Sequence, residues 1–242
     1  NYLAVLRNHA FKMAAANTAK FILVCIPLLL LFSLAVSLML ASFREKRGIF
    51  KTSFLVPMAV PVASIVLLWR VIFHKNGLLN AFTALWGLVP VDWIGSKAAF
   101  GVLVFAYLWK NFGYDMVLWL SGLSAINPAL YEAAQIDGAN IFQRIWYITL
   151  PCIKPTVITM LLLQVGRILR GDFEMFYQIV GNNGQLYNAT DVIDTYVFRS
   201  LIQNSNLGMT AAASFYQSVI CFATILIVNA IVKHVEEDLA LF

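Results

Sequence analysis

The chain has 242 residues, of which 61% are hydrophobic and 12% are charged, about half the charged share of a soluble domain. No water-soluble fold of this length has an interior large enough for so much apolar surface, so we predict an integral membrane protein. The net charge of +5 does not indicate nucleic-acid binding, because the basic residues lie at the ends of apolar runs, where they orient membrane proteins.

The first twenty residues alternate between polar and apolar side chains. We predict that residues 1–20 form an extracytoplasmic amphipathic segment at the membrane surface, and that residues 21–242 form a single transmembrane domain. The chain opens on Asn1 and lacks a basic region followed by an apolar core, so we predict no signal peptide. We expect further residues upstream, including a first membrane span.

Five apolar runs are long enough to cross a bilayer, which takes about twenty residues of helix. The predicted spans are residues 21–42, 52–73, 98–121, 156–180 and 208–232. Pro57 and Pro61 interrupt the second run, and prolines free carbonyl groups that neighbouring helices must satisfy. This span should therefore be kinked and buried. The predicted fold class is an all-α helical bundle with about five spans.

The connecting segments orient these helices. Residues 43–51 contain four basic side chains and one acidic side chain, a cluster that stays in the cytoplasm. Residues 74–97 are rich in Gly, Pro and Asn, so we predict an external loop with a short helix near residues 78–86. The polar stretch 181–207 should be a second external loop, helical over about residues 194–203. Alternation then places the loop 124–155 in the cytoplasm.

This cytoplasmic loop has the pattern of a helical hook. Asn127 can cap a helix that has Pro128 at its first position, where the missing N–H costs nothing. Gly138 provides a position where the backbone can turn out of that helix. A second short helix should follow, with Ile141, Ile145, Ile148, Phe142 and Trp146 on an apolar stripe. Such a hairpin either docks into a groove of another protein or lies in the membrane interface.

The hook resembles the EAA loop of ABC-importer permeases. Glu132-Ala133-Ala134, Gly138 and Ile148-Thr149-Leu150-Pro151 match every fixed position of the pattern E-A-A-x3-G-x9-I-x-L-P, and Asp137 and Ala139 match its common extension. In that family the loop is a coupling helix that rests in a cleft of the cytoplasmic ATPase. The resemblance implies that the ATPase-coupling residues are Glu132, Ala133, Ala134, Asp137, Gly138, Ala139, Phe142, Trp146, Leu150 and Pro151.

Two further runs, Trp109-Lys110-Asn111-Phe112-Gly113 and residues 191–199, look like the carbohydrate branch of these permeases, particularly its oligosaccharide and polysaccharide subgroup, similar to maltose and glycerol-phosphate importers. This resemblance implies a type I ABC-importer permease fold with six spans in the full protein, in the bacterial inner membrane. It also implies four partners, which are a second permease subunit, an ATPase dimer, an extracytoplasmic solute-binding protein and an oligosaccharide cargo.

No G-x4-G-K-[ST] motif occurs, so we expect no cofactor in this chain. The resemblance implies that ATP and Mg are held by the partner ATPases. The chain is therefore predicted to be a non-catalytic subunit. His9, His74 and His234 lie far apart in the sequence, which argues against a catalytic or metal site built from them.

Charged residues inside the predicted spans are the next clue. Lys110 lies about 18 Å from the outer end of its span and Arg167 about 16 Å from the inner end of its own, at roughly 1.5 Å per residue. A charge at that depth costs at least about 2.5 kcal/mol, so both should face protein or water. Arg170 and Glu174 follow Arg167 on the same helical face, and Asp115 lies nearer the cytoplasm.

These groups allow two interpretations. They could simply pair, Arg170 with Glu174 and Lys110 with Asp115 or with an acid of a partner chain. Alternatively, Lys110, Arg167, Arg170 and Glu174 line a substrate path. Aromatic residues near them could stack on sugar rings or could only pack in the bundle; these are Trp109, Tyr114, Phe173 and Tyr177.

Carbohydrate permeases similar to this one tend to carry Asn or small residues where Arg167 and Arg170 stand. We therefore hypothesise an acidic cargo, such as an oligosaccharide of uronic acids, because Arg can bind carboxylates through two parallel hydrogen bonds. The competing class is a self-contained secondary transporter or channel that uses the midplane charges as a relay. A scaffolding subunit would explain the hook but not these charges. An ATPase that co-purifies with the chain would favour the importer.

Overall fold

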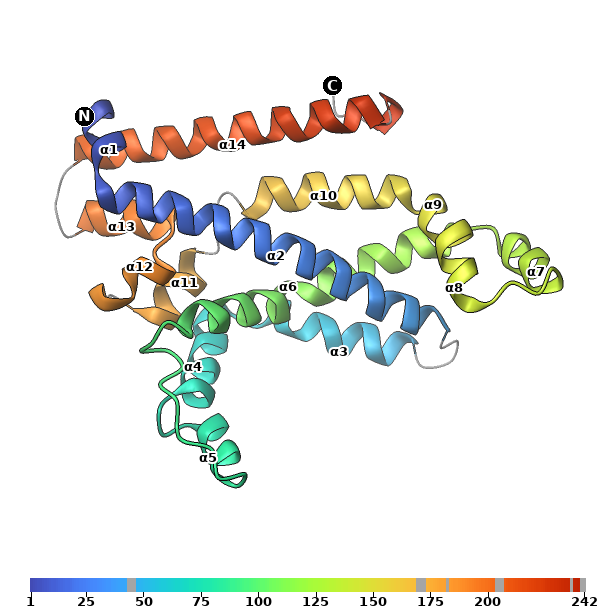
Figure 1. The fold of residues 1–242 in the computed structure, drawn as a ribbon, viewed down its shortest axis with the longest axis horizontal. Helices are drawn as coiled ribbons and strands as arrows, with labels where there is room; N and C mark the ends of the chain where they lie inside the picture. Colours follow the sequence, from blue (N-terminus) through green and yellow to red (C-terminus); the bar gives the residue numbers. More distant parts are fainter. Residues whose placement is uncertain (43–46, 169–172, 182, 203–206, 236, 240–242) are drawn as a thin grey trace.

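The computed structural model describes residues 1–42, 47–168, 173–181, 183–202, 207–235 and 237–239. These residues are almost entirely helical and contain no strand, which confirms the predicted all-α class. Four long helices lie side by side along the long axis of the molecule (Figure 1), and these are α2 (His9–Ser42), α6 (Ala99–Ser124), α10 (Lys154–Ile168) and α14 (Leu207–Val235). Residues 43–46 of the predicted basic cluster lie outside the described part.

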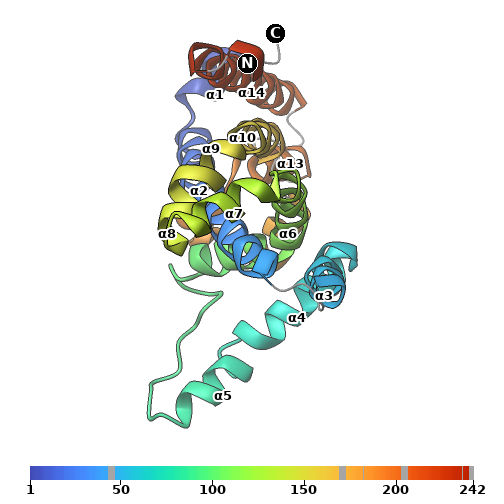
Figure 2. The ribbon, with the colours of Figure 1, turned by 90° about the vertical axis from the view of Figure 1, so that its right-hand side faces the viewer.

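Three of the described helical segments are long and apolar enough to cross a membrane, namely His9–Ala41, Val62–Ala84 and Leu207–His234. A fourth crossing results if Ile141–Cys152 and Lys154–Arg167, which meet at a 65° bend, count as one span. In an end-on view α6 lies beside α2 and below α10 (Figure 2). The predicted multi-pass bundle is confirmed, but the described residues give three or four spans in place of about five. The predicted span 156–180 is divided between the helices Lys154–Ile168 and Phe173–Val180.

The first helices divide differently from the predicted boundary at residue 20. After α1 (Tyr2–Arg7), α2 begins at His9 and continues without interruption through Pro27. Val5 and Phe11 are buried against Ile193 and Tyr196 of α13 (Ile193–Ile202) and against residues of α14. The apolar side of this segment therefore packs on protein. Of its polar side chains, Arg7, Lys12 and Lys20 are exposed, whereas Thr18 is buried and accepts a hydrogen bond from the Ile193 N–H.

Polar side chains join α2 to α6 inside the bundle. Ser33 is fully buried, and its hydroxyl accepts a hydrogen bond of 2.9 Å from Trp119 Nε1. Ser37, one turn later, donates to the Met116 carbonyl at 3.1 Å. Small hydroxyl residues let the two helices approach closely, and their hydrogen bonds are satisfied inside the bundle.

The predicted second span is two helices. α3 (Arg47–Ala59) runs along the bundle, and α4 (Val62–Phe73) leaves it at a steep angle (Figure 1). Pro61 caps α4 in an extended conformation, with φ −54° and ψ 138°, because proline lacks the N–H needed to continue the helix from α3. The predicted kink is thus a sharp bend, whereas the predicted burial of this span is wrong, because most side chains of α3 and α4 are exposed or half-buried. α5 (Leu78–Ala84) follows near the predicted short helix, and Figure 2 shows it projecting from the bundle.

Helices of three to ten residues complete the described chain. On the side of the N-terminus, α13 confirms the helix predicted over residues 194–203. The short α-helices are α7 (Pro128–Ile136), α8 (Ile141–Arg144), α9 (Leu150–Cys152), α11 (Phe173–Val180), α12 (Tyr187–Thr190) and α13 (Ile193–Ile202). Ile145–Thr149 forms a π-helical turn, and Gly184–Leu186 and Glu237–Leu239 form 3-10 turns.

α3 and α6 approach each other closely at Gly113. A Cβ atom at this position would overlap the carbonyl group of Phe54, and the Phe54 ring packs edge-on against Phe112 with centroids 5.2 Å apart. Backbone atoms of α3 therefore occupy the space of a side chain.

We expect Gly113→Ala to force α3 away from α6 and to reduce the amount of folded protein in the membrane severalfold, because overpacking costs typically about 1–3 kcal/mol. Fluorescence-detected size exclusion after detergent extraction measures this amount. Gly101→Ala is the matched control on the same helix, since nothing lies within 4 Å of a Cβ there. Equal yields of the two variants would contradict the close packing.

Candidate functional site

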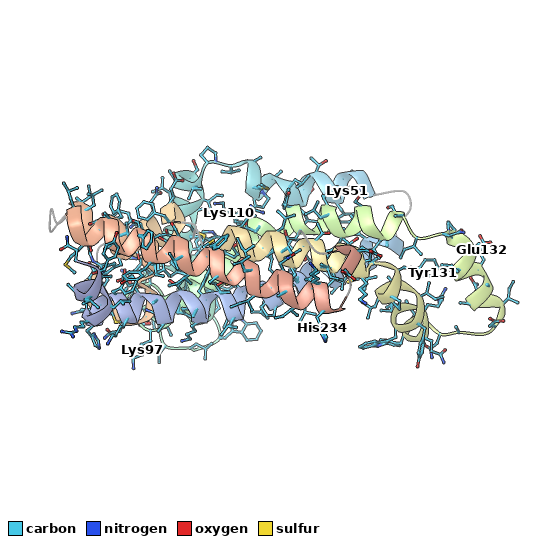
Figure 3. All side chains as sticks on the ribbon, turned by 90° about the horizontal axis from the view of Figure 1, so that it is seen from above. Lys51, Lys97, Lys110, Tyr131, Glu132 and His234 are labelled. Atoms are coloured by element: carbon cyan, nitrogen blue, oxygen red, sulfur yellow. The ribbon has the colours of Figure 1, made fainter. Side chains whose placement is uncertain are left out.

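The hook lies at the end of the bundle opposite the N-terminus. Figure 1 shows α7 and α8 beyond the ends of α6 and α10, and Figure 3 places the labelled Tyr131 and Glu132 at this extremity. His234, near the end of α14, lies toward the same end (Figure 3). The hook therefore projects from one pole of the bundle, and α1 and α13 lie at the other pole.

The first helix of the hook begins as predicted. The Asn127 side chain caps α7 by accepting a 3.0 Å hydrogen bond from the Ala129 N–H, and Pro128 occupies the first helical position. Both features satisfy or remove N–H groups that have no partner within the helix. The start of α7 is thus specified by residues within two positions of it.

The turn out of α7 explains two fixed features of the sequence pattern. Gly138 has a φ of +76°, a conformation that costs glycine nothing. Its N–H donates to the Gln135 carbonyl at 3.2 Å, and the Ala139 N–H donates to the Ala134 carbonyl at 2.9 Å. This is a Schellman motif, in which a glycine ends the helix and the residues on either side pack closely. Small side chains at positions 134 and 139 suit that packing.

The second helix of the hook is also closed by local bonds. Asn140 and Gln143 form a capping box, with side chain to backbone bonds of 2.9 and 2.8 Å. The chain then widens into the π-helical turn, where the Thr149 hydroxyl lies 2.9 Å from the Tyr131 hydroxyl and 3.3 Å from the Arg144 carbonyl. The Tyr131–Thr149 contact ties the first helix of the hook to the second.

The hook has an inner face and an outer face. On the inner face, Ile148 and Leu150 pack with Tyr131 against the buried cluster of Trp119, Ile126, Ile153 and Met160. This cluster joins the hook to α6 and α10. The hook is thus packed against the two helices that enter and leave it.

The outer face carries large apolar side chains with high exposed fractions. They are Ile136 (86%), Tyr147 (79%), Phe142 (71%) and Trp146 (68%). Large apolar side chains with such high exposure on a projecting element favour an interaction surface. Glu132, Ala133, Asp137 and Pro151 are also exposed, while Leu150 is half-buried.

The prediction that Ile141, Ile145 and Ile148 share one face of the second hook helix is wrong. Ile141 is exposed, whereas Ile148 packs inward. The reason is the π-helical turn, because its wider repeat changes the angular spacing of side chains from that of an α-helix. Sequence reasoning also missed Ile136 and Tyr147, although both are apolar residues within the hook.

A cavity of about 490 Å³ lies beside the α3–α4 bend. Residues 58–62 of the bend line one side, Tyr107, Lys110 and Asn111 of α6 line another, and Arg167 of α10 completes it. Figure 3 shows the labelled Lys110 about midway along the bundle. The structure thus brings together two of the predicted cations, from helices far apart in the sequence.

Arg167 also contacts Tyr114 of α6, which is not among the described residues that line the cavity. Its guanidinium carbon lies 5.1 Å from the centroid of the Tyr114 ring, a cation–π arrangement. One turn earlier on α10, Gln164 Nε2 donates to both carboxylate oxygens of Asp115 at 2.7 Å. Asp115 and Gln164 are 0% and 2% exposed. Asp115 is one of the two partners predicted for Lys110. In the structure its carboxylate accepts hydrogen bonds from Gln164.

The other predicted aromatic residues lie elsewhere. Trp109 packs edge-on against Trp69 of α4, with centroids 5.0 Å apart. Phe173 and Tyr177 stack on each other at 5.5 Å, and each contacts Phe198 of α13. These three side chains therefore pack between helices and are not among the residues that line the cavity in the described part of the chain.

Two predicted residues remain to be placed. Glu174 is exposed in the first turn of α11, and Arg170 lies outside the described residues, as does its proposed pairing with Glu174. Sequence reasoning missed Tyr107 and Asn111. Their spacing with Tyr114 (i, i+4, i+7) marks one face of α6 and could have identified them. Among the described residues, no group of three or more His, Cys, Asp or Glu side chains could hold a metal ion.

The geometry can be compared with that of known proteins. The chain is 36% identical over 183 residues to a trehalose/maltose transport system permease of Thermococcus litoralis, covering 75% of this chain and 62% of that protein. It is 26% identical over 164 residues to a polygalacturonan/rhamnogalacturonan transport system permease of Bacillus subtilis, covering 67% of this chain and 50% of the relative. The chain thus spans less than two thirds of these relatives.

A solved structure has the same fold. The crystal structure of a bacterial alginate ABC transporter in complex with an alginate pentasaccharide-bound periplasmic protein contains a chain that matches with a TM-score of 0.90 and 26% identity, covering 97% of this chain and 82% of that one. The family model for the binding-protein-dependent transport system inner membrane component matches residues 33–237. The family predicted from the hook is thereby confirmed, and the chain belongs to the family of binding-protein-dependent transport system inner membrane components.

Proposed function

We propose that this chain is a transmembrane subunit of an ATP-driven, binding-protein-dependent importer of oligosaccharides. The observation that carries the proposal is the two-faced hook. Its inner face is fixed to α6 and α10 through Ile148 and Leu150, and its outer face exposes Phe142 and Trp146. An ATPase subunit would bind the outer face. The family assignment and the sugar-transporting relatives support this function.

The same geometry supports a mechanism. Closure of the ATPase subunits on ATP would move the docked hook. Because α10 follows the hook directly after a 65° bend, its movement would tilt α10 relative to α6 and change access to the cavity between them. A second permease subunit would complete the pathway, and a solute-binding protein would deliver cargo at the pole that carries α1 and α13.

An acidic oligosaccharide is the cargo that the cavity fits best. Lys110 and Arg167 place two cations on its wall, and a guanidinium binds a carboxylate through two parallel hydrogen bonds. Two of the similar proteins have acidic polysaccharides in their names, polygalacturonan in one and alginate in the other. A chain of uronic acids presents one carboxylate on each sugar, so two neighbouring cations could bind at the same time.

Transport by the full complex in proteoliposomes tests this function. We expect uptake of a labelled uronate oligosaccharide to require internal ATP, the ATPase subunits and the loaded solute-binding protein, and to be insensitive to collapse of the proton and sodium gradients. Uptake by this chain without ATPase subunits, driven by an ion gradient, would favour the secondary transporter and refute the proposal.

A further inference from the structure

Tyr114 holds the cation of Arg167 at the edge of the cavity. The guanidinium carbon lies 5.1 Å from the centroid of the ring. Arg167 lines the cavity, whereas Tyr114 is not among the described lining residues. The ring thus contacts the guanidinium from outside the cavity lining, and a cargo carboxylate would approach the same guanidinium from within the cavity.

A second contact fixes the helix that carries Arg167. Gln164 precedes Arg167 by three residues on α10 and so lies on the same helical face. Its amide donates to both oxygens of Asp115 at 2.7 Å, and both side chains are almost fully buried. Asp115 follows Tyr114 directly on α6. Two adjacent residues of α6 therefore hold Arg167 in place. Asp115 holds α10 through Gln164, and Tyr114 contacts the Arg167 guanidinium.

We propose that Tyr114 is a positioning residue that gives the pathway its preference for acidic over neutral oligosaccharides. Its ring restrains the flexible Arg167 side chain, so a bound carboxylate does not have to order the guanidinium by itself. Tyr114 acts on the cargo only through Arg167 and does not stack on the sugar. This inference rests on the proposed function, because it assumes that acidic sugars enter the cavity.

Equilibrium binding to the purified complex, without the solute-binding protein, measures the preference directly. A uronate tetrasaccharide and a neutral tetrasaccharide are titrated against wild type, Tyr114→Leu and Tyr114→Phe. We expect Tyr114→Leu to raise the Kd for the acidic sugar by about 2- to 30-fold, the range of a cation–π contact, and to leave the Kd for the neutral sugar unchanged. Tyr114→Phe retains the ring face and should stay within about twofold of wild type for both.

A double-variant cycle isolates the route through Arg167. In the Arg167→Gln background, Tyr114→Leu should have no further effect on the acidic Kd, because the two residues act on one interaction. An equal rise in both Kd values for Tyr114→Leu would indicate a sugar platform or a general packing defect and would overturn the inference. The inference would also be overturned if Tyr114→Leu left the Kd for the acidic sugar unchanged while Arg167→Gln raised it. That result would be consistent with the proposed acidic cargo.

If Arg167→Gln itself leaves the acidic Kd unchanged, the acidic cargo and the role of Tyr114 are both refuted. The two failures are therefore distinguishable from the same set of titrations.

Discussion

Replacing Gly138 with valine is expected to lower ATP-dependent transport by about 5- to 150-fold while the protein stays in the membrane. The φ of +76° at this position is costly for a β-branched residue, on the order of 1–3 kcal/mol, and about 1.4 kcal/mol corresponds to a factor of ten in an equilibrium. Relief of this strain would open the Schellman turn and displace Phe142 and Trp146 from their docking positions. Uptake into proteoliposomes and co-purification of the ATPase subunits measure the effect.

Gly138→Asn provides the matched control, because asparagine adopts the left-handed conformation more readily than other non-glycine residues. Nothing lies within 4 Å of a Cβ at this position, so neither side chain meets a clash within the chain. We expect the asparagine variant to retain most of the transport. Valine and asparagine variants with the same activity would show that the backbone conformation of the turn is not what coupling requires.

Loss of the cavity cations is expected to have an equally large effect on acidic cargo. Arg167→Gln should reduce the maximal uptake rate of a uronate oligosaccharide by about 10- to 150-fold, since a hydrogen bond to a charged group contributes about 1.5–3 kcal/mol. The rate is measured at saturating loaded solute-binding protein, so that delivery is not limiting. Lys110→Gln should act in the same direction by a smaller factor, because an ammonium cannot bind a carboxylate through a planar fork.

The control for net charge is Lys12→Gln, which removes one positive charge from an exposed position on α2, away from the residues that line the cavity. It should leave uptake within about twofold of wild type, because exposed charges contribute little. A loss of uptake in Lys12→Gln as large as in Arg167→Gln would mean that overall charge, and not the cavity, determines transport. Unchanged uptake in Arg167→Gln would remove the basis for an acidic cargo.

The hook could be predicted in detail because its structure is specified locally. The Asn127 cap, the proline after it and the Gly138 turn each depend on residues a few positions away. Features of this kind can be read from one stretch of sequence, without knowing which helices are neighbours.

The remaining features depend on contacts between distant segments. The roles of Trp109 and Tyr114 differ because one faces Trp69 of α4 and the other faces Arg167 of α10. The steep departure of α4 at Pro61 and the buried Asp115–Gln164 pair likewise depend on how the helices pack. Both aromatics lie on α6 with similar spacing from its charged residues, so periodicity could not distinguish them.

The π-helical turn in the hook is a third such feature. Its hydrogen bond from Thr149 to the Arg144 carbonyl is local, yet no residue type signals a π-helical turn in the way that proline or glycine signals a break. The direction of Ile148 toward the bundle was for this reason not predictable from an α-helical period.

Photo-cross-linking from the hook tests the central claim most directly, namely that its outer face rests on an ATPase subunit. A photoreactive phenylalanine analogue replaces Tyr147, which is 79% exposed on the hook, or Tyr2, which is 54% exposed at the opposite pole. In the assembled complex we predict an adduct with the ATPase subunit from position 147 and none from position 2. An adduct between position 147 and the solute-binding protein, or no adduct with the ATPase in an actively transporting complex, would contradict the account.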